Sequence, residues 1–411
     1  MTRTMLFPLL LVVLWFAPAA HAQEIDAPVA EAQDSVTSVT TVPQRDLMDV
    51  LARLLHKRVE PEVGGTLPVG LEWALLPTFS YNPVYGAAFG ALISGAGQRS
   101  STVARYSQLG ISANYSTKGQ LQAQVRGELF STSGNTLTRI DLRYLDTDRS
   151  TWGLGDITSD QQEYPMSFKL ARVYGTVYRR ASGPVFVGVG YHYDEFREIV
   201  DDRAQNGETT PFVEYSGAGV TRTVASGISL NVLGDTRDNI VNATSGYYLS
   251  ASVRDYAKTL GSDSNWQELW VEMRVYPDLP ARSRNVLGFW IYSWLTFGKA
   301  PYLNLPANGW DTYGRSARGY LQGRIRGANV MYFESEYRHT LTQNGLLGMV
   351  VFLNGTATTN PETNTFTHIS PAAGTGLRFK LNKHTNTNIS LDYGWGRDDQ
   401  KGLFLGMTEV F

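Results

Sequence analysis

The feature that most constrains this fold is a strict two-residue alternation of polar and apolar side chains, which recurs along the chain. Between Gln120 and Leu129, five polar positions alternate with five apolar or small ones. Residues 138–144 and 267–275 repeat the pattern, with charged residues on one side of the segment. A period of two belongs to β-strands, because successive side chains point to opposite faces of a sheet. The sequence therefore predicts an all-β protein.

Such strands fit either a soluble sandwich or a membrane barrel, and the N-terminal sequence favours the barrel. Arg3 precedes an apolar run from Leu6 to Pro18, and Ala20-His21-Ala22 offers the small residues that a signal peptidase reads. Residues 1–22 are therefore expected to be a signal peptide. No later stretch supplies about twenty consecutive apolar residues, so we expect export without a spanning helix.

The C-terminal sequence also resembles that of an outer-membrane barrel. Phe411 is the last residue of a strand-like segment that begins at Gly402, and a terminal Phe on the final strand is the usual ending of such barrels. Glu409 departs from the commonest form, because an aromatic residue is expected at that position. We predict a transmembrane antiparallel β-barrel over residues 67–411, in the bacterial outer membrane.

Composition agrees with an exported protein. The 411 residues include no Cys, which suits an oxidising periplasmic route, and the formal net charge of -2 gives no reason to expect nucleic acid as a partner.

Counting strand-like segments gives about sixteen, an even number typical of bacterial barrels. This count takes 69–81 as the first strand and 212–234 as one long strand. The alternative makes 212–224 and 226–234 a hairpin and drops the first segment. We favour the first count, because only then do the long connections at 148–166, 197–211, 298–327 and 357–368 all fall at odd, extracellular positions.

With that numbering, the turn between strands eight and nine resembles a family signature. Asp235, Arg237 and Asp238 are followed by Gly246, and the stretch resembles the signature turn of the superfamily that contains BamA, TamA and the two-partner-secretion transporters. The two carboxylates could accept backbone N–H bonds and fix the register of the strands, with Gly246 allowing a tight restart. We assign this turn a structural role.

A second motif lies in the predicted sixth loop. Arg318-Gly319-Tyr320 resembles the family's Arg-Gly-aromatic motif, and Glu334, Glu336 and Arg338 resemble its Glu-x-Arg strand. A loop of about thirty residues needs an anchor, and a guanidinium folded into the lumen could pair with a carboxylate on the wall. Glu336 is the first choice of partner and Glu334 the second. Where the family often adds an acidic residue on strand thirteen, this chain has Asn354, so we expect one charge fewer. The alternative is that these are ordinary loop and lumen residues.

The first strand contains Pro77 among outward apolar residues, and a proline donates no ladder hydrogen bond. In the family, strand one meets strand sixteen at a seam, so the resemblance implies a weak seam marked by Pro77 and Phe411. An unpaired position of no mechanistic consequence is the alternative.

The region before the barrel, residues 23–66, is expected to be a periplasmic linker that carries an amphipathic helix at 44–58. It is too short for the POTRA domains that usually accompany the family, so the chain resembles a short, POTRA-lacking branch. The helix could plug the barrel mouth, which we rank first, lie on the inner leaflet, or dock a periplasmic protein.

Two functions follow from the resemblance. The first is insertion or translocation of proteins or lipids at the outer membrane, with outer-membrane lipids and substrate outer-membrane proteins as partners. The second is a passive pore or structural barrel for small solutes. No catalytic motif occurs, and the six histidines show no metal-ligand spacing, so we expect no enzyme activity, metal or cofactor.

Overall fold

The computed structural model describes residues 43–54, 69–82, 86–99, 106–155, 162–280, 284–312, 314–383 and 386–411. All of them belong to one compact unit, Val42–Phe411. The predicted signal peptide, and most of the linker that follows it, lie outside the described residues.

Sixteen strands make up almost all of the regular structure. They are β1 (Glu72–Asn82), β2 (Gly86–Gln98), β3 (Tyr106–Ser116), β4 (Leu121–Phe130), β5 (Thr136–Thr151), β6 (Tyr164–Ser182), β7 (Val185–Asp201), β8 (Thr223–Asp235), β9 (Gly246–Tyr256), β10 (Trp266–Tyr276), β11 (Asn285–Gly298), β12 (Asn329–Thr340), β13 (Leu347–Thr358), β14 (Ser370–Asn382), β15 (Thr387–Trp395) and β16 (Lys401–Met407).

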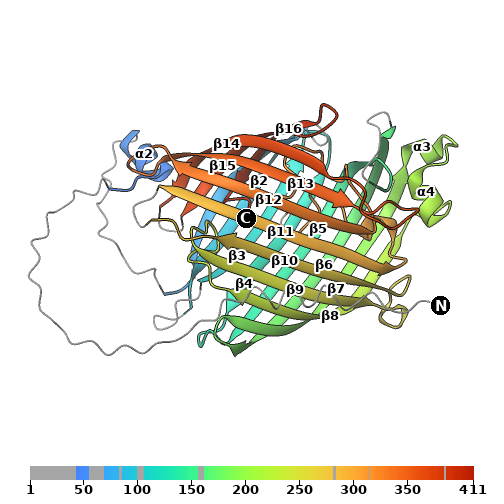
Figure 1. Ribbon diagram of the computed structural model, residues 1–411, viewed down its shortest axis with the longest axis horizontal. Helices are drawn as coiled ribbons and strands as arrows, with labels where there is room; N and C mark the ends of the chain where they lie inside the picture. Colours follow the sequence, from blue (N-terminus) through green and yellow to red (C-terminus); the bar gives the residue numbers. More distant parts are fainter. Residues whose placement is uncertain are drawn as a thin grey trace, which may run out of the picture. The chain divides into compact units, whose positions relative to one another are not determined.

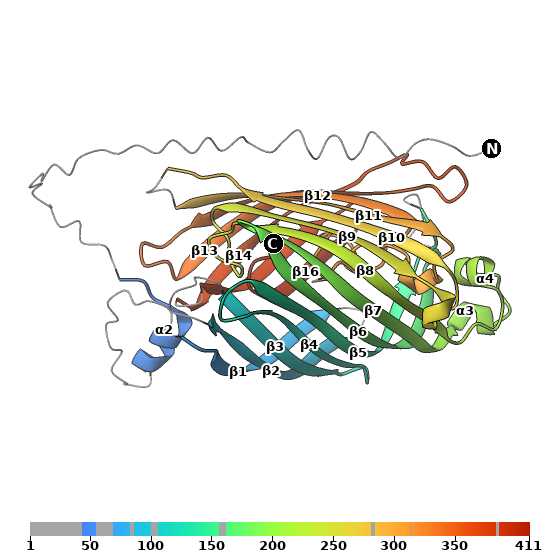
Figure 2. The ribbon, with the colours of Figure 1, turned by 90° about the horizontal axis from the view of Figure 1, so that it is seen from below.

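The strands form one antiparallel sheet in which each strand pairs with its neighbours in sequence (Figure 1). The sheet begins with β1 and ends with β16, and these two strands lie beside each other. The inclined strands wrap around a common interior in both views (Figure 2). This confirms the predicted all-β barrel and its count of sixteen strands.

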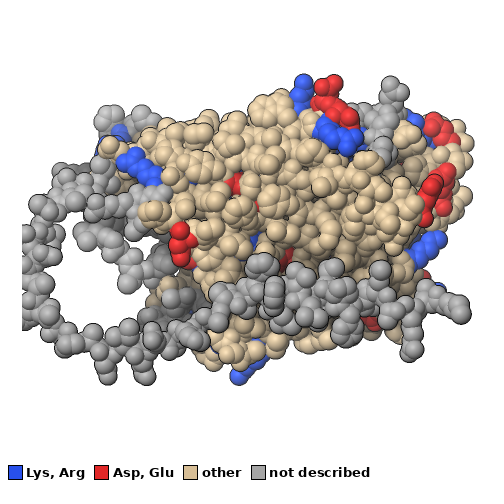
Figure 3. Space-filling view, in the orientation of Figure 1, with Lys and Arg blue, Asp and Glu red and all other residues tan. Residues whose placement is uncertain are grey.

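The two faces of the strands match the alternation in the sequence. On β8, Ile228 and Leu230 are exposed by 55% and 70%, whereas Ser229 and Asn231 are buried. Uncharged residues cover most of the side shown in Figure 3, and charged side chains gather toward its ends. An apolar exterior with a polar interior is the arrangement of a membrane barrel, because lipid replaces water on the outside.

Short helices occupy both ends of the barrel. Helix α2 (Leu47–Leu54) lies at one end, here called the α2 end, and α3 (Asp202–Gln205) and α4 (Pro211–Ser216) lie at the opposite, loop end (Figures 1 and 2). The long connections after β5, β7, β11 and β13 belong to the loop end. Within the described segments, no helix is long and apolar enough to cross a membrane.

The sequence prediction was wrong about the segment before β9. The segment expected as a single strand over 212–234 contains α4, and β8 starts only at Thr223. Thr210 accepts a hydrogen bond from the Val213 N–H at 3.2 Å, and Pro211 occupies the first turn of the helix. An N-cap followed by proline starts a helix at low cost. The proposed hairpin is also absent, because β8 pairs continuously with β7 through Ser226 and Gly227.

Helix α2 covers part of the predicted 44–58 helix, whose last four residues lie outside the described ranges. Asp46 and Asp49 accept each other's backbone N–H groups at 2.9 and 3.1 Å, a reciprocal cap. Lys383, in the turn after β14, donates to both carboxylates. The helix is thus attached to the barrel rim by its N-terminal end.

This attachment should depend on pH. Burial acts to raise the pKa of Asp49, but the hydrogen bonds from Lys383 and from the Asp46 N–H, together with the positive charges of Lys383 and Arg53, outweigh it and hold that pKa below its usual value. The contact between Asp49 and Lys383 therefore stabilises the folded protein fully above the unfolded-state pKa of Asp49, about 3.9. This stabilisation is lost as the pH falls through the lower pKa of Asp49 in the folded state. Hydrogen exchange of α2 should accelerate only in strong acid. Asp49→Asn should accelerate it at neutral pH, and unchanged exchange in that variant would contradict the attachment.

Candidate functional site in the barrel lumen

The connection between β11 and β12, residues 299–328, folds into the barrel; we call it loop six. Most of its residues are buried, including the short helix η3 (Tyr302–Asn304). Internal hydrogen bonds shape it: the Asn308 side chain accepts from the Ile325 N–H at 2.7 Å and donates to the Leu321 carbonyl at 2.9 Å. The loop therefore has an ordered conformation of its own.

Arg318 of loop six is buried, with 2% of its surface exposed. Its guanidinium pairs with Glu334 and Glu336 on β12, and with Asp392 on β15 at 2.5 Å. The same group stacks over the Phe352 ring at 3.7 Å. One side chain of the loop thus contacts carboxylates from two strands that are distant in sequence.

Asp392 is a partner that sequence reasoning missed. The expectation of one charge fewer, drawn from Asn354, does not describe the site: the Asn354 amide donates to the backbone carbonyl of Arg318 at 3.0 Å, and Asp392 supplies a third carboxylate. The alternation of β15 places Asn388, Ser390 and Asp392 on its buried face, so the sequence marked Asp392 as a lumen residue. Only the closure of the barrel brings it to loop six.

These contacts continue into a closed circuit of three arginines and three carboxylates, here called the charge ring. Arg318 joins Glu336, which pairs with Arg338 at 2.6 Å; Arg338 reaches Glu409 at 3.8 Å. The circuit closes through Arg378, which pairs with Glu409 at 2.6 Å and with Asp392 at 2.5 Å. Its members are Arg318, Glu336, Arg338, Glu409, Arg378 and Asp392.

Every member of the charge ring is buried. Taking charges out of water is expensive, and only mutual pairing with good geometry offsets that cost. Removing the charge of any one member leaves its neighbours in the ring buried with a charge that is no longer balanced. Glu334 lies outside the ring, because its contacts are Arg318 and the Tyr332 hydroxyl.

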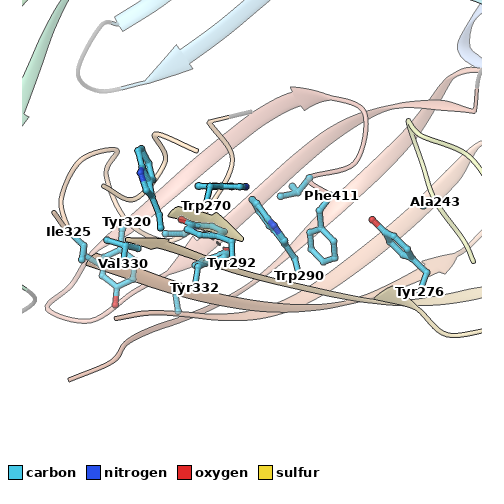
Figure 4. Packing of buried hydrophobic residues seen from close by; sticks show 14 residues of the cluster. Ala243, Trp270, Tyr276, Trp290, Tyr292, Tyr320, Ile325, Val330, Tyr332 and Phe411 are labelled. Carbon is cyan, nitrogen blue, oxygen red and sulfur yellow. Dashed lines mark hydrogen bonds between the residues drawn. The ribbon is translucent and has the colours of Figure 1, made fainter. Parts of the chain in front are cut away.

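The last four residues, Thr408–Phe411, turn into the lumen. Strand β16 ends at Met407, and Thr408 adopts a φ of 72°. Glu409 enters the charge ring, and Arg338 donates to the Phe411 carbonyl at 2.7 Å. The Phe411 ring packs on Trp290 of β11, with 5.5 Å between ring centroids, and on Tyr276 of β10 (Figure 4).

This placement corrects two sequence expectations. Phe411 does not end the final strand, and it lies against β10 and β11 rather than at the seam. The physical reason is the aromatic lining of β10 to β12, which buries Phe411 and leaves Glu409 beside two arginines. A carboxylate two residues before Phe411 is therefore well placed, because it faces the lumen and not lipid.

Gly319 and Tyr320 hold the loop against the barrel wall. Gly319 has a φ of 114°, and a Cβ there would lie 2.8 Å from that of Ala372. Such a conformation and such a close approach both require glycine. The Tyr320 hydroxyl donates to the Pro371 carbonyl at 2.6 Å and accepts from the Arg397 N–H at 2.9 Å.

The turn between β8 and β9 has a dense hydrogen-bond network. Asp235 pairs bidentately with Arg237 and also accepts the Arg237 N–H, and Asp238 accepts the N–H groups of Thr244 and Ser245. The turn also contacts the charge ring, since the Ala243 carbonyl accepts from Arg338 at 3.1 Å.

Gly246 restarts the sheet after this turn, with a φ of 91°; a Cβ there would lie 2.4 Å from the Thr236 carbonyl oxygen. Gly246→Ala should therefore lower the free energy of unfolding by about 3 kcal/mol. Gly183→Ala is the matched control, because Gly183 has a φ of 50° and open space around it, so about 1 kcal/mol is expected. Urea unfolding in detergent micelles measures both, and equal losses would contradict this account.

Pro77 lies on β1, is exposed, and is opposite Ala91 of β2. Among the residues that the structure describes, no backbone ladder joins β1 to β16. Of the two residues assigned to the seam, Pro77 is therefore on a seam strand and Phe411 is not.

No family model matches the chain, and no curated protein matches it. Solved structures do. BamA from Haemophilus ducreyi lacking POTRA domains 1–3 aligns with a TM-score of 0.53 and 13% identity over 84% of this chain and 74% of that one. CdiB from Escherichia coli aligns with a TM-score of 0.54 and 12% identity over 88% of this chain and 68% of that one. The chain has the BamA-type barrel fold. The predicted resemblance is thereby confirmed as a likeness of fold.

The described side chains in the lumen of this BamA-type barrel form ion pairs and aromatic contacts. Across the ranges given above, no group of three or more His, Asp or Glu side chains is arranged to hold a metal ion.

Proposed function

We propose that this BamA-type barrel acts at the bacterial outer membrane in the insertion or translocation of proteins or lipids, with loop six held in the lumen as part of the working structure. The observation that carries the proposal is the charge ring, which joins Arg318 of loop six to β12, β14, β15 and the inward tail. Buried polar networks of this kind specify one arrangement of the groups that they join.

The filled lumen favours this function over a passive pore. Loop six and the tail together bury Tyr302, Tyr320 and Phe411 inside the barrel. A loop that buried ion pairs hold across the lumen would obstruct the passage of solutes. A protein that switches between two conformations needs elements that are coupled to one another, as loop six, the strands and the tail are here. The outward apolar face supplies the contact with outer-membrane lipids, and α2 at the rim is the element available to a periplasmic partner.

Depletion of the protein from its host tests the proposal, with outer-membrane proteins, surface lipids and solute uptake measured in the same cells. Complementation should be complete with the natural chain and with Arg179→Ala, an exposed outward position. It should fail with the double variant Arg318→Ala/Glu334→Gln. This variant removes the loop cation together with one of its carboxylate partners, so that the barrel keeps most of its stability while loop six loses its ion pairs. If protein and lipid assembly stay normal while solute uptake falls, the protein is a pore.

A further inference from the structure

Loop six lines two cavities in the lumen, and the larger one has the size of a small-molecule site. It measures about 390 Å³, within the range of about 300–1,000 Å³ that such sites occupy, whereas the other measures about 80 Å³. Residues of loop six between Gly309 and Gln322 form one wall of the larger cavity, and β4, β5, β15, β16 and the C-terminal tail form the rest. The larger cavity is therefore the candidate for a binding site.

The arginines of this lining bind groups of the protein itself. Oxygen atoms of the chain contact all five: Asp141 pairs with Arg126 and Arg143, the Asp148 carbonyl accepts from Arg149, the Thr408 hydroxyl from Arg315, and Asp392 from Arg318. A charged ligand would compete with these partners, whereas a neutral ligand would leave them in place. The lining is therefore suited to a neutral molecule.

Three neutral polar side chains of the same lining have no hydrogen-bond partner within the part of the chain that the structure describes. They are Gln122 and Gln124 on β4, which are half-buried, and Ser390 on β15, which is buried. An amide offers two donors and an acceptor, and a hydroxyl both donates and accepts. Because polar groups shielded from water gain from a partner, these three side chains favour a ligand that supplies both donors and acceptors.

Aromatic rings complete the lining of this cavity. Trp310 and Tyr320 come from loop six, and Phe404 comes from β16. An aromatic side chain offers a large apolar face for packing. A sugar ring combines a face of C–H groups with a rim of hydroxyls, so it can pack on such a face while its hydroxyls bond to amides. Unpartnered amides beside aromatic rings therefore match the chemistry of an uncharged saccharide.

We propose that this cavity binds a small neutral saccharide, with Gln122, Gln124 and Ser390 bonded to its hydroxyls. Lys401 also lines the cavity and is exposed where β16 begins, so the cavity reaches the loop end of the barrel. A bound saccharide would contact loop six on one side and the strands on the other. The site does not depend on the assembly activity proposed above, because the isolated chain is sufficient for binding.

Equilibrium binding to the full chain in a sugar-free detergent tests this proposal, with labelled glucose, N-acetylglucosamine, lactose and maltose as probes. At least one of them should bind saturably at millimolar concentrations or below. Gln122→Ala/Gln124→Ala should weaken that binding about tenfold, because it removes two hydrogen bonds, and Ser390→Ala about threefold. The matched control is Gln205→Ala/Gln343→Ala, which removes two exposed amides outside the cavity and should leave binding unchanged. The shift of the unboiled band on a gel checks that each variant is folded.

Two further probes separate the possible classes of ligand. Inorganic pyrophosphate represents an anion, and triglycine with both ends capped represents a polypeptide; neither should bind saturably. Binding of either probe without binding of any saccharide would overturn the proposal. So would the absence of saturable binding by all four saccharides, or equal affinity of the folded cavity variant and the control variant.

Discussion

Arg318→Ala should lower the free energy of unfolding by about 3–5 kcal/mol, the usual loss when one partner of a buried ion pair is removed. The change leaves Glu334, Glu336 and Asp392 buried without the guanidinium that all three contact. It also removes the contact of the loop with the ring of Phe352. Urea unfolding in detergent micelles measures the stability, and proteolysis within residues 299–328 reports release of the loop.

The three carboxylates should not respond equally to this loss. Glu336 keeps Arg338 and Asp392 keeps Arg378, whereas Glu334 has no second arginine among its described contacts. Glu334→Gln should therefore restore most of the stability of Arg318→Ala. Glu336→Gln should restore little, because it takes a carboxylate from Arg338. Equal rescue by both changes would contradict the charge ring.

Glu409→Leu is the second large effect, and its sign depends on which way the residue faces. In the lumen, the change removes the carboxylate that pairs with Arg378 and approaches Arg338, so we expect a loss of about 3–5 kcal/mol. At a lipid-facing position of a final strand, leucine would stabilise the barrel, because a carboxylate there opposes insertion. The unfolding midpoint of the folded barrel decides between the two orientations.

A matched control separates burial from the chemistry of the substitution. Glu362→Leu makes the same change at an exposed position between β13 and β14, where the effect should stay within about 0.5 kcal/mol. An increase in stability for Glu409→Leu would place Glu409 outside the lumen and remove it from the charge ring.

Several elements of the site were accessible from the sequence because they depend on local pattern. The alternation of β12 put Glu334, Glu336 and Arg338 on one face, and strand counting placed Arg318 in the loop before it. The helix α4 was missed, because the capping signal at Thr210 and Pro211 competes with an apolar pattern that also suits a strand. Glu409 was interpreted as a departure from the usual pattern of a final barrel strand. In the structure β16 ends at Met407, so Glu409 is not part of a strand.

The sequence by itself determined the all-β class, the number of about sixteen strands and the polarity of their faces, because a period of two is a property of neighbouring residues. It also indicated Glu336 and Glu334 as partners for Arg318. Only the tertiary structure decided which carboxylates surround it: Asp392 is 74 residues away in sequence, and Glu409 reaches the same network only because the chain turns inward after Met407. Closure of the sheet brings β12, β14 and β15 around one interior, and pairing of buried charges then selects the arrangement in which each arginine meets its carboxylates.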